Sequence, residues 1–182
     1  MPIHLGRRPS REGWISFETD PYLTKTKERL YRRCLPCLSG LLEQLKAGTP
    51  RIELREAWTC WKVTVVASGP EECQRILEAF GEAFPAEPVL GKLGGGVGRS
   101  TCAVVFHTES EERRDELVSL LRTVLASRFP GKAVFSSRAC GNPYETLLGP
   151  WPAWQRLATI KHPEKLGSVK ENLIASLYRQ GS

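Results

Sequence analysis

The hydrophobic pattern of residues 58–140 contains two consecutive copies of one supersecondary unit. The first copy is WKVTVVASGPEECQRILEAF followed by PAEPVL, and the second is TCAVVFHTESEERRDELVSLLRTVLASRF followed by PGKAVF. In each copy an alternating stretch predicts a strand, and apolar residues at intervals of three and four predict the helix that follows. The sequence therefore predicts strand, helix and strand, twice in succession.

This order predicts an α+β fold of the ferredoxin-like type, a βαββαβ sandwich with both helices on one face of an antiparallel sheet. We expect the four strands in the spatial order 4-1-3-2, with helices near residues 70–84 and 109–128. Three Ser/Thr-x-x-Glu spacings resemble the capping boxes of helix starts. They are Ser68 with Glu71, Thr108 with Glu111, and Ser168 with Glu171.

The strand alternation also predicts which side chains lie on the sheet face opposite the helices. They are Cys60, Lys62, Thr64, Thr101, Ala103, Val105, His107, Ser136 and Arg138. RNA-recognition domains bind bases on this face through aromatic side chains of the third strand. Residues 99–106 lack both aromatics, so the chain resembles such domains in predicted fold and is assigned to no family. Alternatively, the N-terminal helices, the C-terminal helix or a second subunit covers this face.

The pattern divides the chain into three consecutive parts. These are a basic arm and helical extension at 1–50, the ferredoxin-like core at 51–140, and an aromatic Pro/Gly segment with a helix that packs on the core at 141–182. Residues 1–13 are predicted to be a mobile arm. Asp20 and Pro21 have the residue types of a helix start, and we expect Pro36 to end that helix at a corner. Residues 51–57 are expected to lead into the first core strand.

The segment after residue 140, GNPYETLLGPWPAWQ, is rich in proline, glycine and aromatic residues. We expect an irregular stretch that Tyr144, Trp151 and Trp154 hold against the core. The final helix carries an apolar stripe that either covers a sheet edge or belongs to a dimer. A homodimer through the sheet face or through this helix is therefore an open alternative.

Composition places the chain among soluble globular proteins, with 41% hydrophobic and 25% charged residues. No apolar run approaches the roughly 20 residues that a membrane helix needs. Residues 1–13 also lack the apolar stretch of a signal peptide. We therefore expect a cytoplasmic protein without a membrane partner.

The formal net charge of +6 has its largest excess near the N-terminus, where residues 1–50 carry nine basic and five acidic side chains. Together with the polar sheet face, this charge predicts a non-enzymatic module that binds nucleic acid, either RNA or single-stranded DNA, with RNA preferred. The expected contacts come from the arm, the sheet face and the Gly-rich stretch 91–100. They are Arg7, Arg8, Arg11, Lys62, Lys92, Arg99 and Arg138.

The Gly-rich stretch GKLGGGVGRS could bind phosphate through its backbone N–H groups. It lacks the Walker spacing and precedes a strand instead of a helix, so a flexible hairpin loop is the favoured interpretation. The sequence also lacks the nucleophile motif of the common hydrolases. These observations favour a protein that is not an enzyme.

A different function class depends on the motif Cys34-Leu35-Pro36-Cys37. At a helix start, the helix dipole and the neighbouring Arg32 and Arg33 would favour a reactive thiolate, for redox chemistry or metal binding. The helical sequence before the motif is wrong for a thioredoxin-like site, and the other cysteines and histidines lack zinc spacing. We therefore expect two half-buried cysteines and no cofactor. A redox or metal protein centred on this pair remains one alternative, and a ligand-sensing or oligomeric module another.

Overall fold

The structure is a computed structural model, and it describes residues 1–10, 13–95, 102–138 and 141–180. Four positions named above lie outside the described residues: Arg11, Arg99, Thr101 and Cys140. The contacts within the chain gather into two compact units, and each unit combines two separate stretches of sequence.

The first unit comprises Met1–Lys27 and Trp61–Ser136. Its strands are β1 (Ile3–Leu5), β2 (Trp14–Thr19), β4 (Trp61–Ala67), β5 (Leu90–Gly94), β6 (Cys102–Thr108) and β7 (Val134–Arg138, whose last two residues count with the second unit). The turn η1 (Asp20–Tyr22) follows β2, and the two long helices are α3 (Pro70–Ala83) and α4 (Glu111–Arg128). The described strands form one sheet in the order β1-β2-β5-β6-β4-β7.

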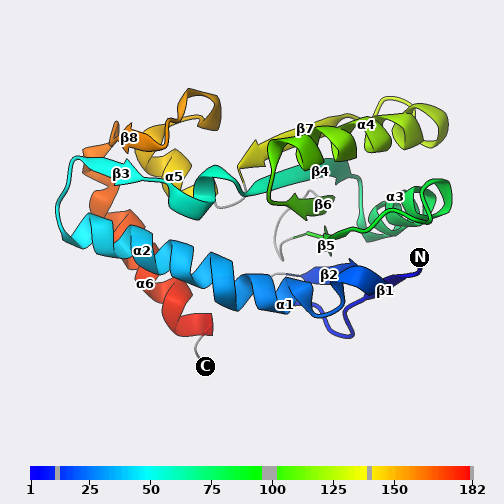
Figure 1. The fold of residues 1–182 in the computed structure, drawn as a ribbon, viewed down its shortest axis with the longest axis horizontal. Helices are drawn as coiled ribbons and strands as arrows, with labels where there is room; N and C mark the ends of the chain where they lie inside the picture. The colour runs from blue at the N-terminus through cyan, green and yellow to red at the C-terminus, as the bar shows by residue number, and fades with distance from the viewer. Residues whose placement is uncertain (11–12, 96–101, 139–140, 181–182) are drawn as a thin grey trace. The chain divides into compact units, whose positions relative to one another are not determined.

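The four strands of the doubled motif lie in the order β7-β4-β6-β5, which is the predicted order. β4 and β5 both pair antiparallel with β6. Alternation places Val63 and Val65 of β4 and Val104 and Phe106 of β6 on one face, where all four are fully buried. α3 and α4 pack on that face and against each other (Figure 1). The predicted α+β architecture with an antiparallel sheet is confirmed.

The N-terminal segment differs from the expected mobile arm. Residues 3–5 and 14–19 form two further strands, β1 and β2, at the β5 edge of the sheet. β2 pairs antiparallel with β5, and β1 pairs antiparallel with β2. The exposed Arg7 and Arg8 lie between β1 and β2, whereas Ile15 and Phe17 give β2 an apolar side that the core of the first unit contacts.

Phe17 joins this hairpin to the core through a space that Gly91 leaves open. The Phe17 ring is fully buried and packs edge-on against Phe106, with 5.1 Å between the ring centres. Gly91 lies opposite Phe17 in the register of β2 and β5. A Cβ on Gly91 would lie 2.6 Å from Cζ of Phe17 and closer still to the carbonyl oxygen of Val105. Glycine at this position therefore makes room for the ring.

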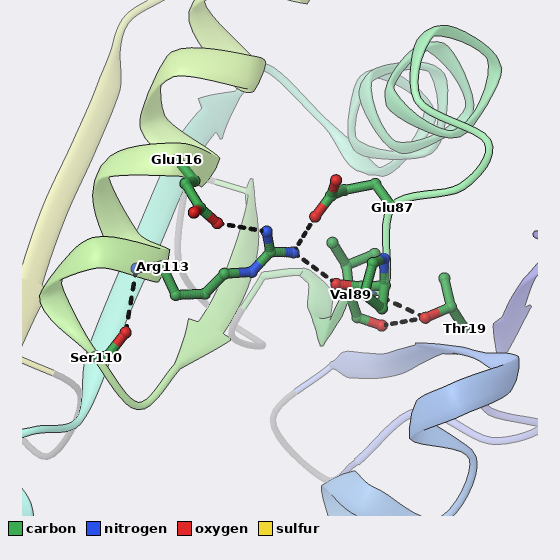
Figure 2. A network of polar contacts seen from close by, with 7 residues as sticks. Thr19, Glu87, Val89, Ser110, Arg113 and Glu116 are labelled. Carbon is green, nitrogen blue, oxygen red and sulfur yellow. Dashed lines mark hydrogen bonds and ion pairs between the residues drawn. The ribbon is translucent and has the colours of Figure 1, made fainter.

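A polar network holds the other end of β2 (Figure 2). The N–H of Val89 donates to Oγ1 of the buried Thr19 at 2.9 Å, and the Thr19 hydroxyl and N–H both donate to the Val89 carbonyl. Beside them, Arg113 of α4 donates to the carbonyl of Pro88 at 2.7 Å and forms an ion pair with Glu87. The start of α4, the turn before β5 and the end of β2 are therefore joined.

The helix starts differ from the predicted capping boxes by one or two residues. At α3, the carboxylate that accepts hydrogen bonds from the backbone N–H and hydroxyl of Ser68 belongs to Glu72 and not to Glu71. At α4, the N-cap is Ser110 instead of Thr108, and its Oγ accepts a backbone N–H of the first turn at 3.1 Å. The spacing therefore located both helices but not their capping partners.

The second unit comprises Glu28–Cys60 and Ser137–Ser182 and has a hydrophobic core of its own. Its elements are η2 (Leu30–Cys34), α2 (Leu35–Lys46), β3 (Arg51–Glu53), η3 (Arg55–Trp58), α5 (Gly141–Leu148), η4 (Trp151–Ala153), β8 (Leu157–Thr159), η5 (Pro163–Lys165) and α6 (Leu166–Gln180). α2 lies beside α6 (Figure 1), and Leu41 and Leu45 of α2 are buried. The boundaries of the two units therefore differ from the boundaries of the three consecutive parts expected from the sequence.

Parts of this unit differ from the expectation. Residues 51–53 form β3, which pairs antiparallel with β8 instead of leading into β4. Residues 141–148 form a helix where an irregular stretch was expected. Ser168 lies inside α6 and does not cap it. The aromatic side chains do pack, since Tyr144 and Trp154 are buried with their ring centres 5.8 Å apart.

The first helical stretch passes Pro36 without the expected corner. α1 (Lys25–Arg29) is followed by η2, a π-helical turn in which the N–H of Leu35 donates to the carbonyl of Leu30. Cys34 has right-handed helical backbone angles, and Pro36 lies in the first turn of α2. A wider π turn directly before a proline accommodates the ring and the missing N–H, so the helical path continues.

Gly91→Ala is expected to destabilise the first unit and to loosen β2. The added methyl group would overlap the Phe17 ring and the Val105 carbonyl, and overpacking of this kind costs about 1–3 kcal/mol. Gly69→Ala is the matched control, because no atom lies within 4 Å of a Cβ there and its φ of −173° suits any residue. Urea unfolding compares the two variants. Wild-type stability in Gly91→Ala would contradict the packing described here.

Glu72 makes the stability of the first unit depend on pH. Its side chain is 13% exposed and accepts hydrogen bonds from Nζ of Lys132 at 2.7 Å and from the Ser68 hydroxyl at 2.8 Å. Mainly because of the bond from Lys132, the pKa of Glu72 lies at about 2 instead of 4.5. Because folding lowers this pKa, the ionised carboxylate stabilises the fold at pH values above the ordinary pKa of 4.5. The stabilisation disappears as the pH falls from 4.5 to about 2.

Glu72→Gln should therefore lower the stability near neutral pH and flatten its decline between pH 4.5 and about 2. The urea midpoint, measured over a pH series, tests this expectation. Glu71→Gln removes the same charge from an exposed neighbour and should keep the wild-type decline. If Glu72→Gln also keeps that decline, another group causes the acid sensitivity.

Candidate nucleic-acid interface

The sheet face opposite α3 and α4 carries the residues that alternation assigns to it in β4 and β6. Lys62 and Thr64 alternate with the buried valines of β4, and both are half-buried. They lie opposite His107 and Val105 of β6 in the strand register. We call this side of the first unit the open face, because α3 and α4 cover the other side.

Two rows of side chains cross the open face from β2 to β4. One row consists of Ser16, Lys92, Val105 and Thr64, and the next consists of Trp14, Gly94, Ala103 and Val66. Lys92 thus shares a face with Lys62, although the sequence predicted Lys92 only as part of the Gly-rich stretch 91–100. β2 adds Trp14 to the same face, one row nearer the hairpin loop.

Lys92 and Trp14 are in contact on this face. Nζ of Lys92 lies over the indole ring of Trp14, 4.2 Å from the ring centre. A cation is attracted to the negative face of an aromatic ring, so the pair presents an aromatic surface and a positive charge side by side. Sequence reasoning missed Trp14 because it assigned no strand or helix to the residues between the predicted arm, 1–13, and the helix start at Asp20. The period-two pattern of WISFET at residues 14–19 was the signal that could have found it.

Arg7 and Arg8 lie in the β1–β2 loop, next to the Trp14 end of β2. Both side chains are exposed. The loop is tied to β2 because the N–H of Ser10 donates to the Trp14 carbonyl at 2.7 Å, and Oγ of Ser10 accepts the Trp14 N–H at 3.2 Å. The two arginines are therefore held at the end of the sheet near Trp14.

The end of β5 reaches the same place. Gly94 has a φ of +111°, and a Cβ on it would lie 2.6 Å from the carbonyl oxygen of Gly13, at the end of the β1–β2 loop. The positive φ and this close approach both require glycine. The structure thus brings the two loop arginines, Trp14 and Lys92 to one end of the sheet, although residues 7 and 92 are far apart in sequence.

Arg138 and Cys60 do not belong to the open face, which corrects the prediction. Arg138 is 5% exposed, and its guanidinium carbon lies 4.1 Å from the centre of the Trp58 ring, within the second unit. Cys60 precedes β4 and is 1% exposed, also within the second unit. Alternation from the core-packed Val134 puts Arg138 on the side of β7 away from the open face, so the prediction used the wrong phase for this strand. Cys60 lies before the first residue of β4.

β7 presents Phe135 instead of the predicted Ser136 to the side away from the core. Val134 packs against the core of the first unit, whereas Phe135 is 56% exposed. Ser136 therefore follows the side of Val134 by alternation. The structure thus adds a second aromatic residue on this side of the sheet, on the edge strand farthest from β1.

Glu18 lies on the open face at the other end of β2. Its carboxylate accepts hydrogen bonds from the segment that follows β2. Its two oxygens accept hydrogen bonds from the backbone N–H groups of Thr24 at 2.8 Å and Thr26 at 2.7 Å. Glu18 thus caps the start of α1, the role predicted for Asp20. Asp20 instead forms a 2.5 Å contact with Nε2 of His4.

Cys34 and Cys37 do not stand at a helix start. The chain before them is already helical, so the end of a helix dipole does not act on them as predicted. Cys37 is buried in the second core, with its Sγ 3.4 Å from the Tyr144 hydroxyl, and Cys34 is half-buried.

The arginines expected to activate this motif have other partners. Arg32 forms an ion pair with Glu28 at 2.9 Å. Nε of Arg33 donates to the sulfur of Cys60 at 2.8 Å, and a terminal N–H of Arg33 donates to the Thr59 hydroxyl at 2.6 Å. These contacts direct the two guanidinium groups to residues outside the Cys34–Cys37 motif.

Within the described ranges, no group of three or more His, Cys, Asp or Glu side chains is arranged to hold a metal ion. Burial raises the pKa of the Cys73 thiol, which belongs to the core of the first unit.

The described residues contain no helix that is both long and apolar enough to cross a membrane.

Replacing Cys34 and Cys37 together by serine is expected to leave the metal content of the purified protein unchanged. Cys37→Ser alone should cost about 1–3 kcal/mol, because it places a hydroxyl in the second core. Cys34→Ser is the matched control and should cost less, since Cys34 is half-buried. Elemental analysis and urea unfolding measure the two quantities. Loss of a stoichiometric metal in the double variant would favour the redox or metal alternative instead.

Comparisons of the chain with protein-family models, with curated proteins and with solved structures found no match. The functional argument therefore depends on the chemistry of the described residues.

Proposed function

We propose that this protein is a non-enzymatic module that binds RNA or single-stranded DNA at the loop end of the open face. The described residues that would contact the nucleic acid are Arg7, Arg8, Lys62 and Lys92. Arg11 and Arg99 stay in the proposal from the sequence alone, because they lie outside the described residues. Arg138 is removed from it, because its guanidinium is buried over the Trp58 ring.

The observation that carries this proposal is that Lys92 lies over the Trp14 ring while the loop with the exposed Arg7 and Arg8 is hydrogen-bonded to Trp14. Basic side chains that neutralise phosphates supply much of the affinity for nucleic acid. Proteins that bind single strands combine such charges with aromatic rings on which bases stack. Both chemical types are present here within one small area, and its arginines are exposed.

We further propose that β4, α3, β5, β6, α4 and β7 form a ferredoxin-like core, which the β1–β2 hairpin extends by two strands. The strand order and the packing of both helices on one face support this assignment. Such a core leaves a sheet face without helices, and that face is the proposed ligand surface. We also propose a cytoplasmic location, because a chain of 182 residues needs no disulfide bonds and cytosolic thiols usually remain reduced.

Arg7→Ala combined with Arg8→Ala should weaken binding to a labelled single-stranded RNA. A phosphate that the variant no longer neutralises keeps its counterions, so the slope of log affinity against log salt should become shallower by about 0.7 for each such phosphate. The double variant should therefore change the slope by about 1.4. Fluorescence anisotropy titrations over a salt series measure both affinity and slope.

The matched control is Arg75→Ala with Arg122→Ala, which removes the same charge from exposed positions on α3 and α4. This control should retain the wild-type affinity and slope. Equal effects of the two double variants would show that only net charge matters and would refute the proposed interface. So would an absence of binding at low salt with protein on the order of tens of micromolar.

A further inference from the structure

Trp14 and Lys92 together have the properties of a site for a stacked base, and we infer that this pair selects single-stranded over duplex nucleic acid. One base of the strand lies on the indole ring of Trp14, and the ammonium group of Lys92 binds the adjacent phosphate. The inference rests on the proposed function. It adds the class of nucleic acid that is bound and the residue that selects it.

The backbone of Trp14 is held in place by its neighbours on both sides. The backbone of Trp14 pairs with Gly94 on β5 and bonds twice to Ser10 in the loop, through its N–H and its carbonyl. Trp14 is half-buried, so part of its side chain remains open to solvent. A ring that is already held in place loses little conformational freedom when a base stacks on it, which favours binding.

The residues beside Trp14 on the sheet have small side chains. The next residues across the sheet are Gly94, which has no side chain, and Ala103, which has a single methyl group. Val66 follows on β4 and is 41% exposed. Adjacent strands lie about 4.8 Å apart, so the three strand spacings between Trp14 and Val66 amount to about 14 Å.

The charges around the ring fit a nucleic-acid strand. Lys92 lies over the ring itself, and the exposed Arg7 and Arg8 lie in the loop at the same end of the sheet. The carboxylate on the same face of β2, that of Glu18, is four residues away and caps α1. An anionic chain that also carries flat aromatic groups matches this arrangement, and a single-stranded nucleic acid is such a chain.

A duplex could use only part of this site. Its bases are stacked on one another, so their faces cannot reach the indole ring without being unstacked. Its phosphates could still contact the arginines. The site should therefore bind a duplex through charge alone, and a single strand through charge and stacking together.

The test uses the full chain and three labelled probes with matched numbers of phosphates. They are a single-stranded RNA, the same strand with abasic residues in place of its bases, and an RNA duplex. Anisotropy at low salt should show at least about fivefold tighter binding to the intact strand than to the abasic strand or the duplex, because one stacked base contributes about 1 kcal/mol or more.

Trp14→Ala should abolish the difference between the intact and abasic strands. Trp14→Phe should keep most of it, because a phenyl ring also stacks on a base. Phe135→Ala is the matched control, because it removes an exposed aromatic side chain from the far edge strand. This control should leave the preference for the intact strand unchanged.

Equal affinity for all three probes, with Trp14→Ala binding like wild type, would overturn the inference and leave the proposed function standing. No binding to any probe would overturn both. If Trp14→Ala does not fold, the comparison of intact and abasic strands with wild type and Trp14→Phe decides the question. Loss of the preference in Phe135→Ala alone would assign the stacking to β7 and would also overturn the inference.

Discussion

The packing of the Phe17 ring into the space left by Gly91 is the contact on which the proposed interface depends. A side chain at residue 91 would occupy the volume of the ring and press on the carbonyl of Val105. Because glycine stands there, β2 lies along β5 and extends the sheet. This pairing holds Trp14 beside Lys92 and places the loop with Arg7 at the same end.

The two sides of the sheet in the first unit have different roles. The side under α3 and α4 is filled with aliphatic and phenylalanine side chains, and its burial stabilises the fold. Around it, charged groups are engaged in structural pairs, such as Arg113 with Glu87 and Lys132 with Glu72. The open side carries the Lys92–Trp14 contact, and the exposed Arg7 and Arg8 lie in the loop at the same end of the sheet.

The centre of this fold could be predicted because its signals are local. The alternation in β4 and β6 and the spacing of three and four in α3 and α4 specify which side chains face the core. The same alternation placed Lys62 on the open face, whereas the position of Lys92 on that face follows only from the pairing of β5 with β6. Local signals were less accurate at helix starts, because Glu71 and Glu72 both lie one turn from Ser68. The path of the chain into the helix decides which carboxylate reaches its N–H.

The sequence by itself determined the α+β class, the order of the repeated elements and the apolar faces of their helices. Only the tertiary structure decided that the N-terminal residues join the sheet, that residues 51–53 pair with β8, and that Arg138 is buried over Trp58. The physical reason is that these features depend on partners far away in the chain. A pattern of neighbouring residues can predict that a side chain such as Phe17 will be buried, but it contains no information on the glycine that receives it.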